Sequence, residues 1–143
     1  MNILILGSDE ILNLFTLLKH FQNNINHVTN FDSKLYWEQY HLIITDSFHL
    51  TIIDDQYEGI IFNIVTSTDN LSTRDNVVNL FMNFNFDYKT ASDDLINQFI
   101  KNKRWNFYYR TCHKAKVKFI YDLFSQCEEY NKIHSKEVKF YKI

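Results

Sequence analysis

Short apolar runs alternate with amphipathic segments through the first hundred residues of this 143-residue chain. The opening run, Ile3-Leu4-Ile5-Leu6, is continuously apolar and ends at Gly7, which is typical of a strand buried on both faces of a parallel sheet. Apolar side chains then recur at spacings of three and four over 11–21, so a helix is predicted there, with Ser8 or Asp9 as its cap. Further strands are predicted near 26–30, over 41–45, over 59–65 and near 84–88.

Helices are predicted near 32–37, through 77–82, and over 90–100 with Thr90 or Ser92 as the cap. The segment 48–58 is short and rich in β-branched residues, so only a turn of helix or an irregular loop is expected there. Strands that alternate with helices are the signature of a doubly wound parallel sheet. We therefore expect an α/β protein with a three-layer, mostly parallel sheet.

The end of the chain has a different pattern. Every second residue over 105–110 is aromatic, beginning with Trp105, and this alternation favours a strand. A helical stripe follows over 117–131, and the residues of 137–142 alternate again as in a strand. Because no linker rich in Gly, Pro or Ser precedes this part, we expect a β-α-β extension of residues 105–143 packed on the same domain as a core of residues 1–104.

The formal charge of the chain is split between its two ends. Residues 1–100 carry 13 acidic and 4 basic side chains, a charge of −9, whereas residues 101–143 carry 4 acidic and 11 basic ones, a charge of +7. Such a basic segment suits an acidic protein or nucleic acid, and the acidic part of a second copy in a homodimer would suit it equally. The candidate partner-binding residues are Arg104, Trp105, Tyr108, Arg110, Lys114, Lys116 and Lys118.

Cationic side chains can contact phosphates while exposed aromatic rings stack on bases, so nucleic-acid binding through 101–118 is one interpretation of this segment. The other is a solvated basic face over aromatic side chains that belong to the core. An acidic protein partner would suit the +7 charge of residues 101–143 equally well. The sequence leaves the choice open.

Several classes are disfavoured by composition. Gly7 and Gly59 are the only glycines, too few for a phosphate-binding loop of the kinase or P-loop type. No apolar run approaches the ~20 residues of a membrane helix, and two cysteines are too few for a disulfide framework. We therefore expect a cytoplasmic protein without a membrane partner.

In an open parallel sheet, ligands bind beyond the carboxyl ends of the strands. The chain places Asp9 and Glu10 after the first predicted strand, Asp46 after the third, Thr66 after the fourth and Lys89 after the fifth. Two acids, a third acid, a hydroxyl and an amine therefore follow successive strands. In this order of side chains, residues 1–104 resemble the receiver domain of two-component response regulators, which has a flavodoxin-like fold.

The resemblance implies roles for these side chains. Asp46 would accept a phosphoryl group, the hydroxyl of Thr66 would bond the product phosphate, and Lys89 would neutralise its charge. A Mg²⁺ ion would be held by Asp9, Glu10 and Asp46, because hard oxygen ligands suit that ion.

The sequence also departs from the receiver pattern. Gly7-Ser8 stands where receivers have their acidic pair, the spacing from Asp46 to Thr66 is shorter than in the family, and Thr90 replaces the usual proline after Lys89. We therefore expect a degenerate pocket without a resident cofactor, with Mg²⁺ only if the pocket functions. The expected role is regulation or signalling, not metabolic catalysis.

Two alternatives to this regulatory role remain open. The first is an adaptor without phosphate chemistry that binds a partner through its basic tail. The second is a small nucleotide-using enzyme in which Gly7-Ser8 approaches a phosphate and Asp32 holds a ribose. Helix capping explains Asp9 and Asp32 without a ligand.

Overall fold

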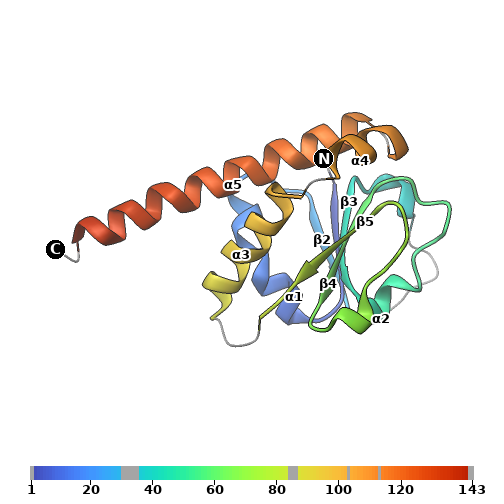
Figure 1. The fold of residues 1–143 in the computed structure, drawn as a ribbon, viewed down its shortest axis with the longest axis horizontal. Coiled ribbons are helices and arrows are strands. Elements are labelled where there is room, and N and C mark those ends of the chain that lie inside the picture. Colours follow the sequence, from blue (N-terminus) through green and yellow to red (C-terminus); the bar gives the residue numbers. More distant parts are fainter. Residues whose placement is uncertain (1, 30–35, 84–86, 103, 113, 142–143) are drawn as a thin grey trace.

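A computed structural model describes residues 2–29, 36–83, 87–102, 104–112 and 114–141 (Figure 1). Its centre is a five-stranded, all-parallel sheet with the order β2-β1-β3-β4-β5. This order is that of flavodoxin-like doubly wound sheets, so the predicted α/β fold is confirmed. The strands are β1 (Ile3–Leu6), β2 (Ile25–Val28), β3 (Leu42–Asp46), β4 (Ile60–Val65) and β5 (Val77–Phe81).

Helices cover one face of the sheet and form the larger core. Alternate strand residues such as Ile5, Ile44 and Phe62 are buried there, as expected from the period-2 geometry of strands. Figure 1 shows these helices on one side of the sheet. They are α1 (Asp9–Leu14), the 3₁₀ helix η1 (Thr16–His20), α3 (Tyr88–Ile100), α4 (Trp105–Thr111) and α5 (Lys114–Tyr141).

Single turns and loops cover the other face. There Leu6 and Ile43 pack with Tyr40, Ile53 and Tyr57 in a smaller core. The predicted reduction of the 48–58 crossover is confirmed, because only four helical residues lie between β3 and β4. The short elements of this face are η2 (Trp37–Gln39), α2 (Ser47–Leu50) and η3 (Thr68–Asn70).

The fifth strand lies earlier in the chain than predicted. Residues Val77–Phe81 form β5, where a helix was expected. Val77, Val78 and Leu80 are all buried, and short apolar runs buried on both faces do not reveal by periodicity whether they are helical. The strand predicted near 84–88 lies partly outside the described residues, and Tyr88 begins α3. The cap of α3 is Asp87, which accepts a hydrogen bond from the backbone N–H of Thr90.

The C-terminal part is α-helical, so the prediction of a β-α-β extension is wrong. The residues expected to form its first strand form α4, and residues 137–141 of the strand expected over 137–142 lie inside the 28-residue helix α5. Long-range packing decides this outcome. The ring of Trp105 packs edge to face against those of Phe99 and Tyr121, with ring centroids 4.5 Å and 4.8 Å apart. A helix places Trp105 and Tyr108 on the same side, toward these partners.

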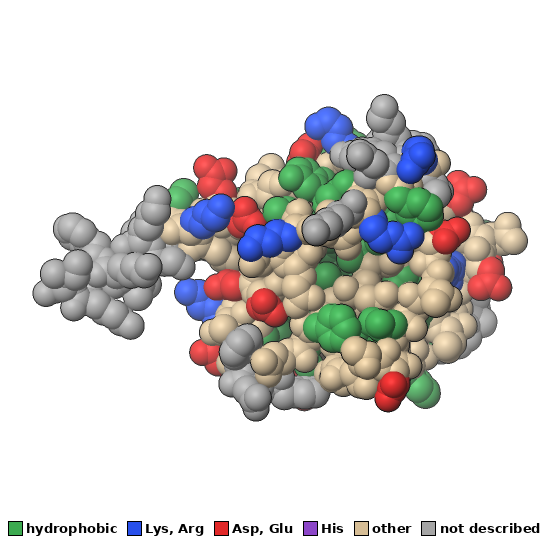
Figure 2. All heavy atoms as spheres, viewed as in Figure 1, with side chains coloured by type: hydrophobic (Ala, Val, Ile, Leu, Met, Phe, Trp, Pro, Cys, Tyr) green, Lys and Arg blue, Asp and Glu red, His purple; other side chains and the backbone are tan. Residues whose placement is uncertain are grey.

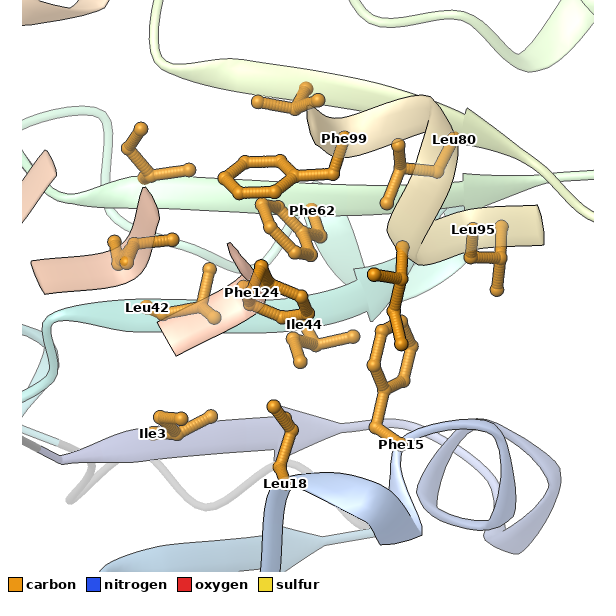
Figure 3. Packing of buried hydrophobic residues seen from close by; sticks show 14 of the residues in the cluster. Ile3, Phe15, Leu18, Leu42, Ile44, Phe62, Leu80, Leu95, Phe99 and Phe124 are labelled. Atoms are coloured by element: carbon orange, nitrogen blue, oxygen red, sulfur yellow. The ribbon is translucent and has the colours of Figure 1, made fainter. Parts of the chain in front are cut away.

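Helix α5 completes the main core and does not form a separate unit. Phe124 is fully buried, and its ring lies 5.2 Å from that of Phe62 and 4.9 Å from that of Phe99 (Figure 3). Figure 1 shows α5 running along the helical face and extending past the sheet. In the described part of the chain, no helix is both long and apolar enough to cross a membrane.

Candidate functional site

Asp46 ends β3 at the carboxyl edge of the sheet, where the sequence placed it. Its carboxylate oxygen Oδ1 accepts a hydrogen bond of 2.8 Å from the backbone N–H of His49 and lies 2.8 Å from His49 Nδ1. The Asp46 side chain therefore caps α2 and holds the imidazole at the same time. A carboxylate occupied in this way is less available to a phosphoryl group or a metal.

Gly7 brings the end of β1 close to this pair. Its φ of +154° is a conformation that other residues rarely adopt. A Cβ atom there would lie 2.8 Å from Ile11 Cδ1 and 3.2 Å from the Oδ2 atom of Asp46. The glycine thus serves the close approach of backbone and carboxylate. This packing explains Gly7 without a bound phosphate.

Asp9, one of the three acids of the predicted metal site, is surrounded by solvent and by His27. The side chain of Asp9 is 83% exposed, and its Oδ1 lies 3.8 Å from Nδ1 of His27. The other ring nitrogen of His27 lies 2.9 Å from the carbonyl oxygen of Gly7. Across the described residues, no three or more His, Cys, Asp or Glu side chains form a group that could hold a metal ion.

A network of hydrogen bonds around the buried Asn63 side chain links this edge of the sheet to the neighbouring short helices. Asn63, fully buried in β4, donates from Nδ2 to Asn79 Oδ1 at 3.0 Å and to the Asn70 carbonyl at 3.2 Å. Its Oδ1 accepts from the Ser47 hydroxyl at 3.2 Å. The sequence reasoning missed this network, although an asparagine inside an apolar strand was its signal. The network ties η3 and α2 to the sheet.

Two adjoining hollows lie at the carboxyl edge. Glu10, Asp46 and Thr66 line the first, of about 270 Å³, so the structure brings these three predicted residues together. The second hollow, of about 310 Å³, shares Glu10 and Met82 with the first and continues to Asp87. Leu14 and Ala91 contribute to the apolar part of its lining, and Tyr88 also lines it.

The charged side chains that line the two hollows are all acidic. The backbone N–H of Thr90 donates to Asp87 and holds the pKa of that carboxyl below its usual range, so Asp87 is ionised near neutral pH. Among the described lining residues, neither hollow has a Lys or Arg. Exposed aromatic rings stand beside the acids, with Phe48 79% and Tyr88 51% exposed. Such a surface favours cationic and apolar groups over phosphates.

Lys89 lines a different hollow from Asp46. It lies in the first turn of α3, in a depression between η1, α3 and α5 that also contains His20, Asp93 and Tyr130. Burial raises the pKa of Asp93, and the ammonium group of Lys89 acts against this. Because β5 ends at Phe81, Lys89 is already within a helix and does not follow a strand directly. The predicted set of Asp46, Thr66 and Lys89 is therefore not assembled around one cavity.

The predicted aromatic contact residues of the tail belong to the core. Tyr108 is buried, and its hydroxyl donates to the Val77 carbonyl at 3.3 Å, at the open edge of β5. Trp105 packs against Phe99, and the Arg104 guanidinium lies 4.4 Å from the centre of the Phe107 ring. Of these candidates, Trp105 and Tyr108 are therefore packing residues, not exposed stacking surfaces.

The basic candidates belong to α4, to its N-cap Arg104 and to α5. Arg104 and Arg110 are exposed, Lys116 is half-buried, and Lys118 pairs with Asp122 at 3.1 Å. The side chain of Lys114 lies outside the described residues. Figure 2 shows Lys and Arg side chains spread along the side of the molecule on which α4 and α5 run, with Asp and Glu side chains among them.

One exposed apolar side chain on this face was not predicted. Phe119 is 57% exposed on α5 and lies three residues after Lys116, so the two share a face of the helix.

Comparison with known proteins finds no match: no family model, no curated protein and no solved structure resembles the chain closely enough to count as one.

Proposed function

We propose that the protein is a regulatory binding module with a receiver-like topology, which contacts an acidic protein surface through the basic face of α4 and α5. In this proposal it transfers no phosphoryl groups. The receiver-like strand order supports the regulatory class, and the +7 charge of residues 101–143 supports the kind of partner.

The observation that carries the proposal is that Asp46 and Lys89 line different hollows. Phosphoryl transfer to Asp46 would need a cation facing the transferred group, because charge develops on its oxygens. Lys89 lines another hollow, and Asp46 is engaged by His49. The acids Glu10 and Asp46 alone would repel a phosphate. A pocket with these acids, and with no lysine among its described lining residues, fits a degenerate receiver that transfers no phosphoryl group.

The packing of Trp105 and Tyr108 against the core favours protein over nucleic acid as the partner. Binding of single strands relies on exposed rings on which bases stack, and Trp105 and Tyr108 pack inward. The exposed cations Arg104, Arg110 and Lys118, together with the exposed ring of Phe119, match an acidic surface that also offers an apolar contact.

A nucleotide-using enzyme has less support. Helix α1 has only six residues, so its N-terminal dipole offers little to a phosphate, and Glu10 lies in its first turn. Asp32, the candidate ribose ligand, lies outside the described residues.

Beryllofluoride with Mg²⁺ tests the absence of phosphoryl chemistry, because it mimics an acyl phosphate on a working receiver. We expect no change in the melting temperature of the wild-type protein and none with Asp46→Asn. A rise in the wild type that Asp46→Asn abolishes would show a functioning acceptor and would refute this part of the proposal.

A fluorescent polyglutamate peptide and a single-stranded oligonucleotide of equal charge test the partner. The double variant Lys116→Glu/Lys118→Glu should weaken peptide binding by about tenfold or more at low salt, since screening is weakest there. Lys132→Glu is the matched control, because Lys132 is as exposed as Lys118 and has the same kind of partner four residues away. Tighter binding of the oligonucleotide than of the peptide would instead indicate nucleic acid.

A further inference from the structure

The second hollow at the carboxyl edge combines an apolar lining with acids at its margin. Leu14, Met82 and Ala91 supply apolar surface, and Glu10 and Asp87 supply the negative charge. Its volume of about 310 Å³ is at the lower end of the range for small-molecule sites, and is large enough for one aromatic side chain. A fitting group therefore has an apolar body and a nearby cation.

Helix α5 presents that combination on its surface. Phe119 is 57% exposed, and Lys116 precedes it by three residues on the same helix face. Aromatic side chains, phenylalanine among them, are enriched in protein interfaces, and Lys116 adds a cation beside this one. The basic face thus carries both features that the hollow accepts.

These two surfaces lie at opposite ends of one molecule. Tyr108, in α4, bonds the carbonyl of Val77 at the start of β5, whereas Met82 of the hollow follows the end of that strand. Five strand residues separate these points by about 17 Å. Figure 1 shows the start of α3 at the other end of the sheet from α4. The chain does not fill its own hollow with Phe119, which is exposed.

We infer that the acidic partner is a second copy of this chain, bound head to tail. Phe119 of one copy enters the hollow between α1 and the start of α3 of the next, with Lys116 beside Glu10. This inference rests on the proposed use of the basic face and identifies the partner of that face. The opposite formal charges of residues 1–100 and residues 101–143, −9 and +7, favour this arrangement over one in which like patches meet.

The contact joins two different surfaces, so it is heterologous. Each added copy leaves one free hollow and one free α5 face, and such contacts produce rings or open chains. A symmetric dimer is not expected.

Sedimentation from micromolar to millimolar concentration tests this arrangement with the full chain. The mass of the wild type should rise with concentration and fall toward the monomer in high salt, where the charge contacts are screened. Phe119→Ser and Glu10→Lys should each remain monomeric. Both change exposed side chains, and an unchanged melting temperature would confirm that each variant folds. Ile133→Ser, which changes another exposed apolar residue of α5, should behave as the wild type.

Mixing the two variants is the decisive measurement. Phe119→Ser keeps an intact hollow and Glu10→Lys keeps an intact α5 face, so an equimolar mixture should form a one-to-one dimer and nothing larger. A mixture that remains monomeric would overturn the inference, as would self-association of Phe119→Ser. A wild type that stays monomeric but binds the acidic peptide through Lys116 and Lys118 would overturn the inference alone. A wild type that neither self-associates nor binds the acidic peptide would overturn the proposed function as well.

Discussion

Replacing Phe124 by alanine tests whether the C-terminal helix is part of the core or an accessory. Phe124 is fully buried on α5 and meets the rings of Phe62, Phe99 and Phe15 at 5.2, 4.9 and 6.4 Å. These three rings come from β4, α3 and the segment after α1, so one side chain joins α5 to three other elements (Figure 3).

The expected loss of stability follows from this environment. Truncation of a buried Phe to Ala costs about 3–5 kcal/mol, because apolar surface is lost and a cavity remains. The three ring contacts place the cost toward the upper end, since aromatic pairs add about 0.5–1.5 kcal/mol beyond their area. A domain with a typical stability of about 5–15 kcal/mol would lose a large share of it. The melting temperature should fall by roughly 10–20 °C.

Urea unfolding followed by circular dichroism measures this loss directly. The matched control is Phe119→Ala, the same substitution five residues earlier on the same helix, where the side chain is 57% exposed. We expect the control to change the free energy of unfolding by less than about 0.5 kcal/mol. A Phe124→Ala loss below about 1 kcal/mol, or one equal to that of the control, would refute the packing of α5 against the core.

The remaining predictions concern three buried side chains, those of Tyr108, Asn63 and Cys127. Tyr108→Phe should lower the free energy of unfolding by about 1 kcal/mol, because the Val77 carbonyl loses its hydrogen bond, and it should leave acidic-peptide affinity unchanged. Asn63→Leu should cost about 1–3 kcal/mol in urea unfolding, since Ser47 and Asn79 lose their buried partner; an unchanged midpoint would contradict the network. Burial raises the pKa of the Cys127 thiol from 9.0 to about 12, so mass spectrometry should find this thiol unlabelled by Ellman's reagent in the folded protein at pH 8 and labelled in urea. Because the unfolded thiol loses its proton first, Cys127 should also lower the free energy of unfolding as pH rises from about 9 toward 12.

The prediction of the candidate site depended on knowing where each strand ends. The position of Asp46 was predictable, because the apolar run before it reads as a strand and the next residues are polar. The position of Lys89 was not, because it required knowing that the fifth strand ends at Phe81 and that α3 begins at Tyr88. The fifth strand was predicted seven residues too late, near 84–88, and this error placed Lys89 at the wrong end of an element and in the wrong hollow.

The aromatic tail shows the same limit in a different way. The alternation at 105–110 favoured a strand, and this prediction was wrong, because the same order of residues also fits a helical face. Phe99 and Tyr121, which pack on Trp105, lie in other helices, and their contacts favour the helical alternative. Exposure of Trp105 and Tyr108 could not be judged before these neighbours were placed.

The sequence by itself determined the class of fold, the strands β1, β3 and β4, the reduced crossover after β3, and the opposite charges of the two ends. These features follow from local runs and from counts, which do not depend on distant residues. Only the tertiary structure decided which polar side chains share a hollow, which aromatic rings are buried, and where an exposed Phe119 lies relative to an acidic, apolar hollow. Such facts depend on residues that are far apart in the chain and become neighbours only when the core packs.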